Sequence, residues 1–219
     1  MDEKLLIDGL LQYLGLVILL TCHEFGHAWM ALRCGDDTAQ REGRVSLNPL
    51  VHIDLLGTVI LPLIMIFLSL TGSGMGGFLL GWAKPVPVNP SNLRRPRTDD
   101  ILVTLAGPWM NLLLGFVLIG LARLAGMAHG EFMVDPVLAI AHLSLLLCFF
   151  NLLPIPPLDG SQVVRSLTGM TYATYHEISR YGYFILIIAL QVPLVQHLLY
   201  GVTATSYASI CRLFGVELI

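Results

Sequence analysis

The chain has 219 residues, of which 55% are hydrophobic and 12% are charged, and its mean hydropathy is +0.75. Soluble domains carry about a quarter of charged residues, so this composition excludes an ordinary soluble domain and predicts an integral membrane protein. The net charge of −3 argues against a nucleic-acid partner. The four cysteines are scattered, without a CxxC motif, and we interpret them as free thiols.

The first two apolar stretches are the longest. Residues 5–32 predict a helix longer than the ~20 residues that cross a membrane. Residues 55–83 carry no charge but contain Pro62 and a glycine-rich run at 71–77. These helix-breaking residues predict a helix, then a turn, then an extended return.

Three further stretches predict helices, and their ranges are 101–122, 136–153 and 181–200, the last bent near Pro193. The expected fold is therefore an all-α membrane protein: a polytopic helical bundle with about five apolar segments. A re-entrant or extended β-like segment is expected near the active site. We treat residues 1–219 as one integral-membrane domain, with a core over 5–168 and an extra C-terminal helix.

Basic residues gather in three loops, which follow the first stretch, follow the second stretch and precede the last one. Short basic loops stay in the cytoplasm, so all three are expected on the cytoplasmic side. Both flanks of residues 55–83 are then inside, and this stretch must enter and leave on one side. It is either a re-entrant hairpin or a spanning helix whose extended return passes through protein. Non-helical backbone at membrane depth needs protein or a water-filled cavity around it, which places residues 77–88 beside a cavity.

The pentapeptide His23-Glu24-Phe25-Gly26-His27 lies within the first apolar stretch. Residues four apart share one face of a helix, so His23 and His27 can bind the same ion, with Glu24 beside them as a general base. This is the pattern of a zinc hydrolase. The alternative is a polar helix interface without metal, at the cost of three ionisable groups in apolar surroundings.

A catalytic zinc needs a third protein ligand and an open position. Asp159 is the candidate, since it follows a proline-rich break at the cytoplasmic end of the fourth stretch and so reaches the depth of His27. The alternative role for Asp159 is a helix-capping carboxylate at a turn.

These residues resemble the site-2 proteases, which are zinc-dependent intramembrane metalloproteases. Their two signatures, HExxH and a later NxxPxPxLDG, stand here complete and in order, the second over residues 151–160. Residues 81–90 and 106–111 extend the resemblance, to the compact bacterial branch without a PDZ domain. The resemblance implies one Zn²⁺ per chain, bound by His23, His27 and Asp159, with Glu24 activating the water.

The expected activity is therefore hydrolysis of peptide bonds in membrane-embedded substrate helices, by a multi-pass protein of the cell membrane. Its partners are a transmembrane protein substrate and the lipid bilayer, and its active site faces the cytoplasmic side. The oligomeric state is left open. The alternative is a metal-handling transporter or sensor that uses the same residues. A transporter gains little from an acid beside a metal ligand, and the inverted repeats typical of transporters are not visible.

A substrate helix must unwind before it is cut, and an extended protein edge offers its backbone new partners. Residues 81–88 are the candidate edge, and Trp82, Val86 and Val88 are its candidate substrate contacts. Trp82 could instead be an interface anchor. Asn111 and Asn151 are candidates for substrate binding or transition-state stabilisation, although asparagine in a membrane bundle is often only an interhelical hydrogen-bonding residue.

Overall fold

The computed structural model describes residues 3–70, 81–129 and 134–216. Within these ranges the regular structure is helical. The helices are α1 (Glu3–Cys34), α2 (Thr38–Arg41), α3 (Leu61–Leu70), α4 (Pro96–His129), α5 (Val134–Asn151), α6 (Asp159–Thr168), α7 (Tyr172–Ser179), α8 (Gly182–Gln191) and α9 (Pro193–Phe214). A π-helical stretch, Leu55–Ile60, precedes α3, and short 3-10 turns lie at Pro49–Val51 and Pro90–Asn92.

The prediction of a polytopic helical membrane protein is confirmed. Of the described helices, α1, α4 and α5 are long and apolar enough to cross a membrane. The pair α8 and α9 counts as a fourth candidate span, bent by 82°, and Leu55–Leu70 forms a shorter apolar helix. The bend lies where expected, because Pro193 begins α9 and supplies no N–H to continue α8.

Two parts of this region were not predicted from the sequence. The last helix was expected to end at residue 200, whereas α9 continues to Phe214. The short helices α6 and α7 were also missed. Both have mixed polar sequences, and the C-terminal end of α6 is closed by Gly169 in a left-handed conformation, with φ of 71°. Such short helices give no long periodic signal, so tertiary packing decides them.

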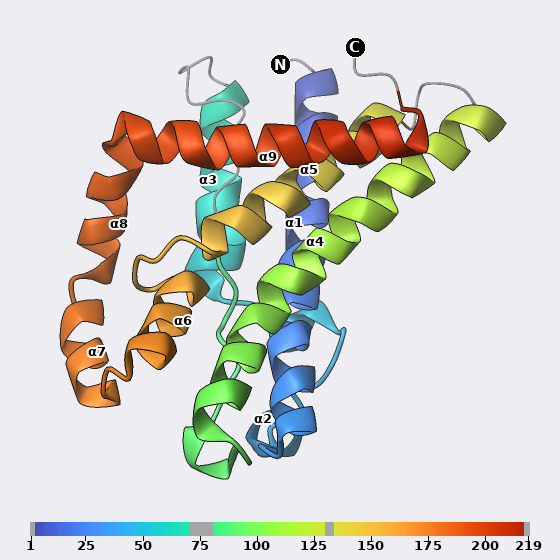
Figure 1. Ribbon diagram of the computed structural model, residues 1–219. Helices are drawn as coiled ribbons and strands as arrows, with labels where there is room; N and C mark the ends of the chain where they lie inside the picture. Colours follow the sequence, from blue (N-terminus) through green and yellow to red (C-terminus); the bar gives the residue numbers. More distant parts are fainter. Residues whose placement is uncertain (1–2, 71–80, 130–133, 217–219) are drawn as a thin grey trace.

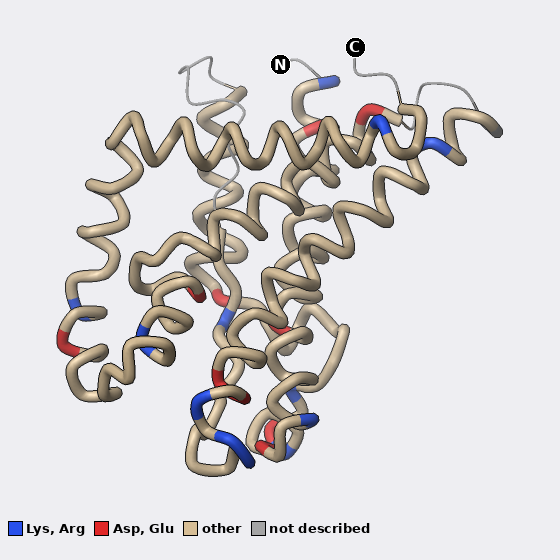
Figure 2. Tube along the Cα trace, in the orientation of Figure 1, with Lys and Arg blue, Asp and Glu red and all other residues tan. Residues whose placement is uncertain are grey.

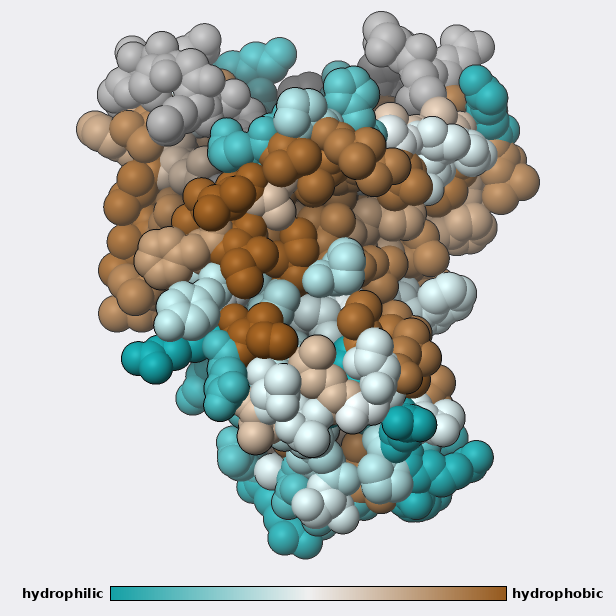
Figure 3. All heavy atoms as spheres, turned by 60° about the vertical axis from the view of Figure 1, so that its left-hand side comes forward, coloured by the Kyte–Doolittle hydropathy of each residue, from teal (hydrophilic) through white to brown (hydrophobic). Residues whose placement is uncertain are grey.

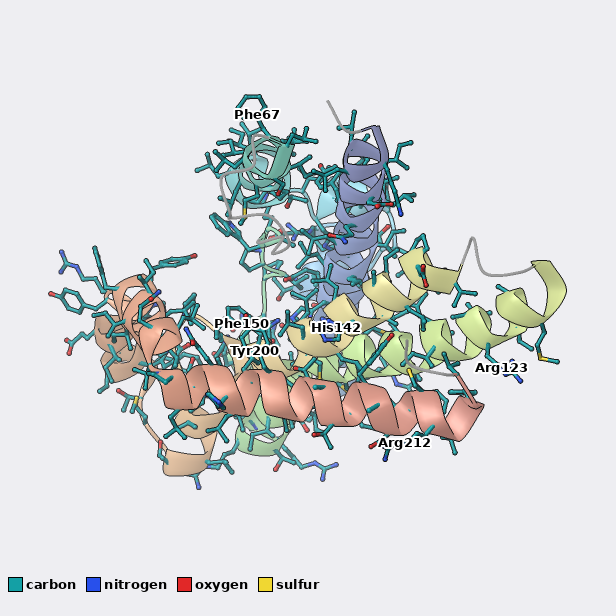
Figure 4. All side chains as sticks on the ribbon, turned by 90° about the horizontal axis from the view of Figure 1, so that it is seen from above. Phe67, Arg123, His142, Phe150, Tyr200 and Arg212 are labelled. Atoms are coloured by element: carbon teal, nitrogen blue, oxygen red, sulfur yellow. The ribbon has the colours of Figure 1, made fainter. Side chains whose placement is uncertain are left out.

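Helices α1, α4 and α5 form the centre of the molecule, and α6 packs against α4 (Figure 1). Helix α9 runs across the end of the bundle at which both termini lie. Seen from above, α9, with Tyr200 and Arg212, lies on one side of α4 and α5, whereas α3, with Phe67, lies on the other side (Figure 4). The central helix α4 therefore positions α6, whose first turn contributes to the site described below.

The charged residues concentrate at the two ends of the bundle, most of them at the end opposite the termini (Figure 2). That end carries the loops after α1, before α4 and between α6 and α8. One face shows an apolar band over its upper part and hydrophilic residues below (Figure 3). This distribution is the one expected for a chain whose middle is in contact with lipid.

The chain returns from α3 through a non-helical segment, residues 81–89, as predicted. The Trp82 backbone N–H donates to Gly57 O at 3.2 Å, and the Lys84 N–H donates to His52 O at 2.8 Å. The segment thus comes back to the level at which the π-helical stretch begins. The glycine-rich turn expected at 71–77 lies outside the described residues.

Candidate active site

Helix α1 carries two buried histidines on one face, His23 and His27, which are 6% and 9% exposed. Their positions, four apart, bring the two Nε2 atoms within 3.0 Å of each other. The surrounding residues of α1 are mostly aliphatic or alanine, which favours a continuous helix at membrane depth. The helix therefore holds both imidazoles rigidly toward the same point.

A close helix crossing forms one wall of the site. A Cβ added to Gly26 of α1 would lie 2.7 Å from Ala106 O of α4, so the two backbones touch where α1 has no side chain. On α4, a Cβ added to Gly107 would lie 2.7 Å from His23 Nε2 and would also meet His27 Nε2. Glycine at both positions lets the helices approach closely and leaves space at the imidazole nitrogens.

Asp159 reaches the same point from the first turn of α6. The preceding Leu158 is buried, and Gly160 packs so tightly that an added Cβ would lie 2.5 Å from Leu153 O. The residues on either side of Asp159 thus fix the start of α6 against the end of α5. A carboxylate at this position is also stabilised by the N-terminal end of the helix dipole.

The three side chains fit a zinc ion. The three ligand atoms lie 3.0 Å (His23 Nε2 to His27 Nε2), 3.2 Å (His23 Nε2 to Asp159 Oδ2) and 3.5 Å (His27 Nε2 to Asp159 Oδ2) from one another. Tetrahedral zinc with bonds of about 2.0–2.2 Å separates its ligand atoms by about 3.3–3.6 Å, so a separation larger by a few tenths of an ångström accommodates the ion. Asp159 Oδ2 is also buried without a hydrogen-bond partner among the described residues. Burial opposes ionisation of Asp159, but the imidazoles beside it outweigh burial and lower its pKa.

The second nitrogen of each imidazole is directed at α4. His27 Nδ1 lies 2.8 Å from the Val103 main-chain oxygen, and His23 Nδ1 lies 3.1 Å from Asn111 Nδ2. Ligating histidines usually have such a partner on the other ring nitrogen, because it fixes the orientation of the ring. Helix α4 therefore supports the histidines without supplying a ligand.

Glu24 follows His23 on α1 and faces a cavity of about 410 Å³. Its Oε2 accepts a hydrogen bond of 2.8 Å from the Val86 backbone N–H. His23, His27 and Asp159 line the same cavity. An acid, a three-residue ligand set and an open space thus meet at one place, the arrangement that hydrolysis by a metal-activated water requires.

Comparison with known proteins agrees with this geometry. The model of peptidase family M50 matches residues 12–129 and 118–190. The chain belongs to peptidase family M50. It is 35% identical over 211 residues to "Putative zinc metalloprotease YwhC" of Bacillus subtilis, covering 91% of this chain and 89% of that protein. It is 32% identical over 193 residues to "Putative zinc metalloprotease Rip2" of Mycolicibacterium smegmatis, covering 84% of this chain and 70% of that protein. No solved structure matches.

This M50 peptidase is thus a zinc-dependent metalloprotease of the site-2 type, built as a multi-pass helical membrane protein. The resemblance found in the two sequence signatures is confirmed. Of the described residues, His23, His27 and Asp159 are the group that could hold a metal ion.

The M50 peptidase places most of its predicted substrate residues at the cavity. Trp82, Val86, Val88 and Asn151 line it. The indole of Trp82 also contacts the Tyr183 ring of α8, at 6.4 Å between centroids. Asn151 donates through Nδ2 to Leu147 O at 2.9 Å, within its own helix.

Asn111 lies elsewhere, fully buried on α4 behind His23, and it is absent from the described cavity wall. The structure thus separates the two asparagines that the sequence treats alike. Asn151 is at the cavity, whereas Asn111 contacts the Nδ1 side of the His23 ring.

An ionic cluster beside the cavity was not anticipated. Arg165 of α6 pairs with Asp100 of α4, and Ser166 donates to the same carboxylate. The Tyr172 hydroxyl donates to Asp100 at 3.2 Å, and the Arg165 guanidinium lies 3.9 Å from the centre of the Tyr172 ring. We call these four residues the α4–α6 cluster. It fixes α6, and with it Asp159, against α4.

Proposed function

We propose that the chain is an intramembrane endopeptidase that cuts membrane-embedded segments of other proteins, with its active site toward the cytoplasmic side of the cell membrane. The supporting observation is the position of the ligand set. His23 and His27 lie on α1, a candidate membrane span, and line a cavity that residues of the non-helical segment 81–88 also line. A protease for soluble peptides has no need to place its ligands within an apolar helix, where each polar group carries a cost.

The residues divide the chemistry between them. Zinc held by His23, His27 and Asp159 would supply an acidified water and polarise the substrate carbonyl. Glu24 takes the proton from the attacking water and then delivers it to the leaving amine, so no net proton is consumed at the carboxylate. The Val86 N–H holds the Glu24 carboxylate at 2.8 Å, which orients the base toward the cavity.

Capture of the substrate by strand addition is the second part of the proposal. One edge of the 81–88 segment is occupied: Thr58 Oγ1 donates to Trp82 O at 2.8 Å, and buried Arg44 donates to Lys84 O at 2.6 Å. Within the described part of the chain, the backbone groups of Ala83 have no hydrogen-bond partner, and Ala83 lies between Trp82 and Lys84, so its groups are directed at the opposite edge. Ala83 lines the cavity. An unwound substrate can pair with this edge, which replaces hydrogen bonds that it loses on unwinding.

The first test compares the wild type with Glu24→Gln, in detergent or vesicles, on a panel of single-span membrane proteins. Glu24→Gln keeps the size of the side chain but cannot take a proton. We expect about one zinc per chain in both proteins and a loss of cleavage by several orders of magnitude in the variant. A His23→Ala, His27→Ala double variant serves as the metal-free control. Full zinc occupancy in that control, or wild-type cleavage by Glu24→Gln, would contradict the proposal.

The second test addresses strand addition. Bulky or polar substitutions at Val86 or Val88 should slow cleavage of helical substrates and leave zinc content unchanged. A Pro or Gly near the substrate's cleavage site should partly restore the rate, since each lowers the cost of unwinding by about 1–3 kcal/mol. The matched control is the same substitution at Val202, a half-exposed valine of α9 far from the segment in sequence. Equal rates for all variants would show that the segment only closes the bundle.

The orientation is tested by labelling single cysteines in a chain that lacks Cys22, Cys34, Cys148 and Cys211. Position 40 is in α2 and position 95 directly precedes α4; α2 and the start of α4 lie at the end opposite the termini (Figure 1). Both should react with a membrane-impermeant reagent only when the cytoplasmic face is accessible. Reaction of the two positions from opposite faces would contradict the proposed arrangement.

A further inference from the structure

We infer that Asn111 is a positioning residue for the metal: its side-chain oxygen accepts a hydrogen bond from the Nδ1–H of His23 and so leaves Nε2 free as a ligand. This inference rests on the proposed function, because it assigns His23 to the metal. Asn111 is 0% exposed and stands four residues after Gly107, on the face of α4 that packs on the histidines.

The other ligand histidine shows what such a partner does. His27 Nδ1 lies 2.8 Å from the Val103 main-chain oxygen, which can only accept. His27 must therefore carry its proton on Nδ1, and the lone pair of Nε2 is directed at Asp159. His23 needs the same arrangement to bind the same ion, and the Asn111 amide is the group that faces its Nδ1.

The amide as placed presents its NH₂ group to His23 Nδ1, at 3.1 Å. That pairing would make Nδ1 the acceptor and put the ring proton on Nε2, the nitrogen that has to bind the metal. It also leaves Asn111 Oδ1 buried without a partner among the described residues. The pairing as placed is therefore incompatible with His23 binding the metal through Nε2, whereas the carboxamide itself has only one hydrogen-bond partner among those residues, the His23 ring.

A half-turn of the carboxamide resolves the conflict over the ring proton. The oxygen and nitrogen of an amide have nearly the same shape, so the turn exchanges them without moving the helices. Oδ1 then accepts from Nδ1–H, and the lone pair of His23 Nε2 points at Asp159 Oδ2, 3.2 Å away. Removal of such a partner from a ligating histidine typically lowers metal affinity 10- to 100-fold.

The test measures zinc affinity by competition with a chromogenic chelator, on the purified full chain in detergent. Asn111→Asp keeps an acceptor oxygen at the same position and should bind zinc within about threefold of the wild type. Asn111→Leu has a similar volume but no acceptor, and Asn111→Ala has neither. Both should lose about 10- to 100-fold in zinc affinity. The Co²⁺-substituted Leu and Ala variants should also show a changed visible absorption spectrum, which reports the ligand set directly.

The matched control is Ser144→Ala. Ser144 is buried beside Asn111, and its Oγ donates to the Asn111 main-chain oxygen at 2.7 Å without touching a ligand. The Ser144→Ala variant should have a lower melting temperature, with zinc affinity and the Co²⁺ spectrum unchanged. If Asn111 only packs α4 against α1, the Asp variant should lose as much affinity as the Leu variant, and the inference is overturned. Wild-type zinc affinity in a folded Leu or Ala variant overturns it too.

The use of two acceptor-free variants keeps the test decisive if one of them does not fold. Failure of this inference is also distinct from failure of the proposed function. A wild-type chain that binds no zinc contradicts the proposed function. A wild-type chain that binds zinc and cleaves, with an equally tight Asn111→Ala variant, contradicts only the role of Asn111.

Discussion

Gly107 allows a sharp test of the metal site, because its missing side chain is what leaves room at the histidines. In Gly107→Ala the new Cβ would lie 2.7 Å from His23 Nε2, 2.6 Å from His27 Cε1 and closer still to His27 Nε2. Real Cβ atoms essentially never approach other heavy atoms this closely, so at least one ring must move. The Nε2 atoms of His23 and His27 are the two nitrogens that would have to share the ion.

The magnitude follows from the cost of that movement. An inserted methyl group in a close-packed interior costs about 1–3 kcal/mol. If one imidazole moves to relieve the clash, the free energy of zinc binding becomes less favourable by this amount. About 1.4 kcal/mol corresponds to a factor of ten in affinity. We therefore expect Gly107→Ala to lower zinc affinity by about 5- to 150-fold, and cleavage to fall with the occupied fraction.

The assay compares chelator competition and thermal unfolding for Gly107→Ala and Gly115→Ala. Gly115 lies two turns further along α4, and its added Cβ would meet the Leu145 side chain at 2.8 Å. This control introduces the same methyl group into the same helix without a ligand nearby, so it should change stability and leave zinc affinity unaffected. Wild-type zinc affinity in Gly107→Ala would refute the placement of the metal between the two Nε2 atoms.

Three further outcomes are expected. Arg165→Met leaves the Asp100 carboxylate buried without its ion-pair partner, so the free energy of unfolding should fall by about 3–5 kcal/mol and zinc affinity should weaken. The Arg165→Met, Asp100→Asn double variant removes the unpaired charge and should regain part of both losses. Asp36 is buried, and burial tends to raise its pKa, but hydrogen bonds from Thr38, Asn92 and the Asn89 N–H outweigh burial and lower it. Its stabilisation should be complete above the unfolded pKa of about 3.9 and be lost as the pH falls through the lower folded pKa, so melting temperatures of Asp36→Asn and wild type should converge at low pH. Removal of zinc with a strong chelator should abolish cleavage, and added Zn²⁺ should restore it in the wild type but not in His23→Ala.

The sequence predicted the parts of the fold and site that depend on local pattern. The apolar helices follow from composition, and the His23 and His27 pair follows from helical spacing. The return of the chain at Trp82 was predicted from helix-breaking residues and from the basic flanks, which require both ends of the stretch on one side.

The remainder depends on contacts that leave no local trace. The partner of His27 is the main-chain oxygen of Val103, and every residue type has such an oxygen. Arg165 and Asp100 are 65 positions apart, and each alone looks like an ordinary loop charge. The hydrogen bond from the Val86 N–H to Glu24 was equally invisible, although the sequence predicted an extended segment near the active site. Long-range pairing of this kind needs the packed structure.

The separation of the ligands along the chain has a consequence for biosynthesis. His27 and Asp159 are 132 positions apart, as the difference of their numbers gives. At the ~5–20 residues per second of protein synthesis, roughly 7–26 s pass between the making of the two. During that interval a nascent chain already carries Glu24 and both histidines but cannot complete a three-ligand site. On the ligand set proposed here, the metal site stays incomplete until α6 has been made and has packed against α4, so a nascent chain gains its hydrolytic centre only late in synthesis.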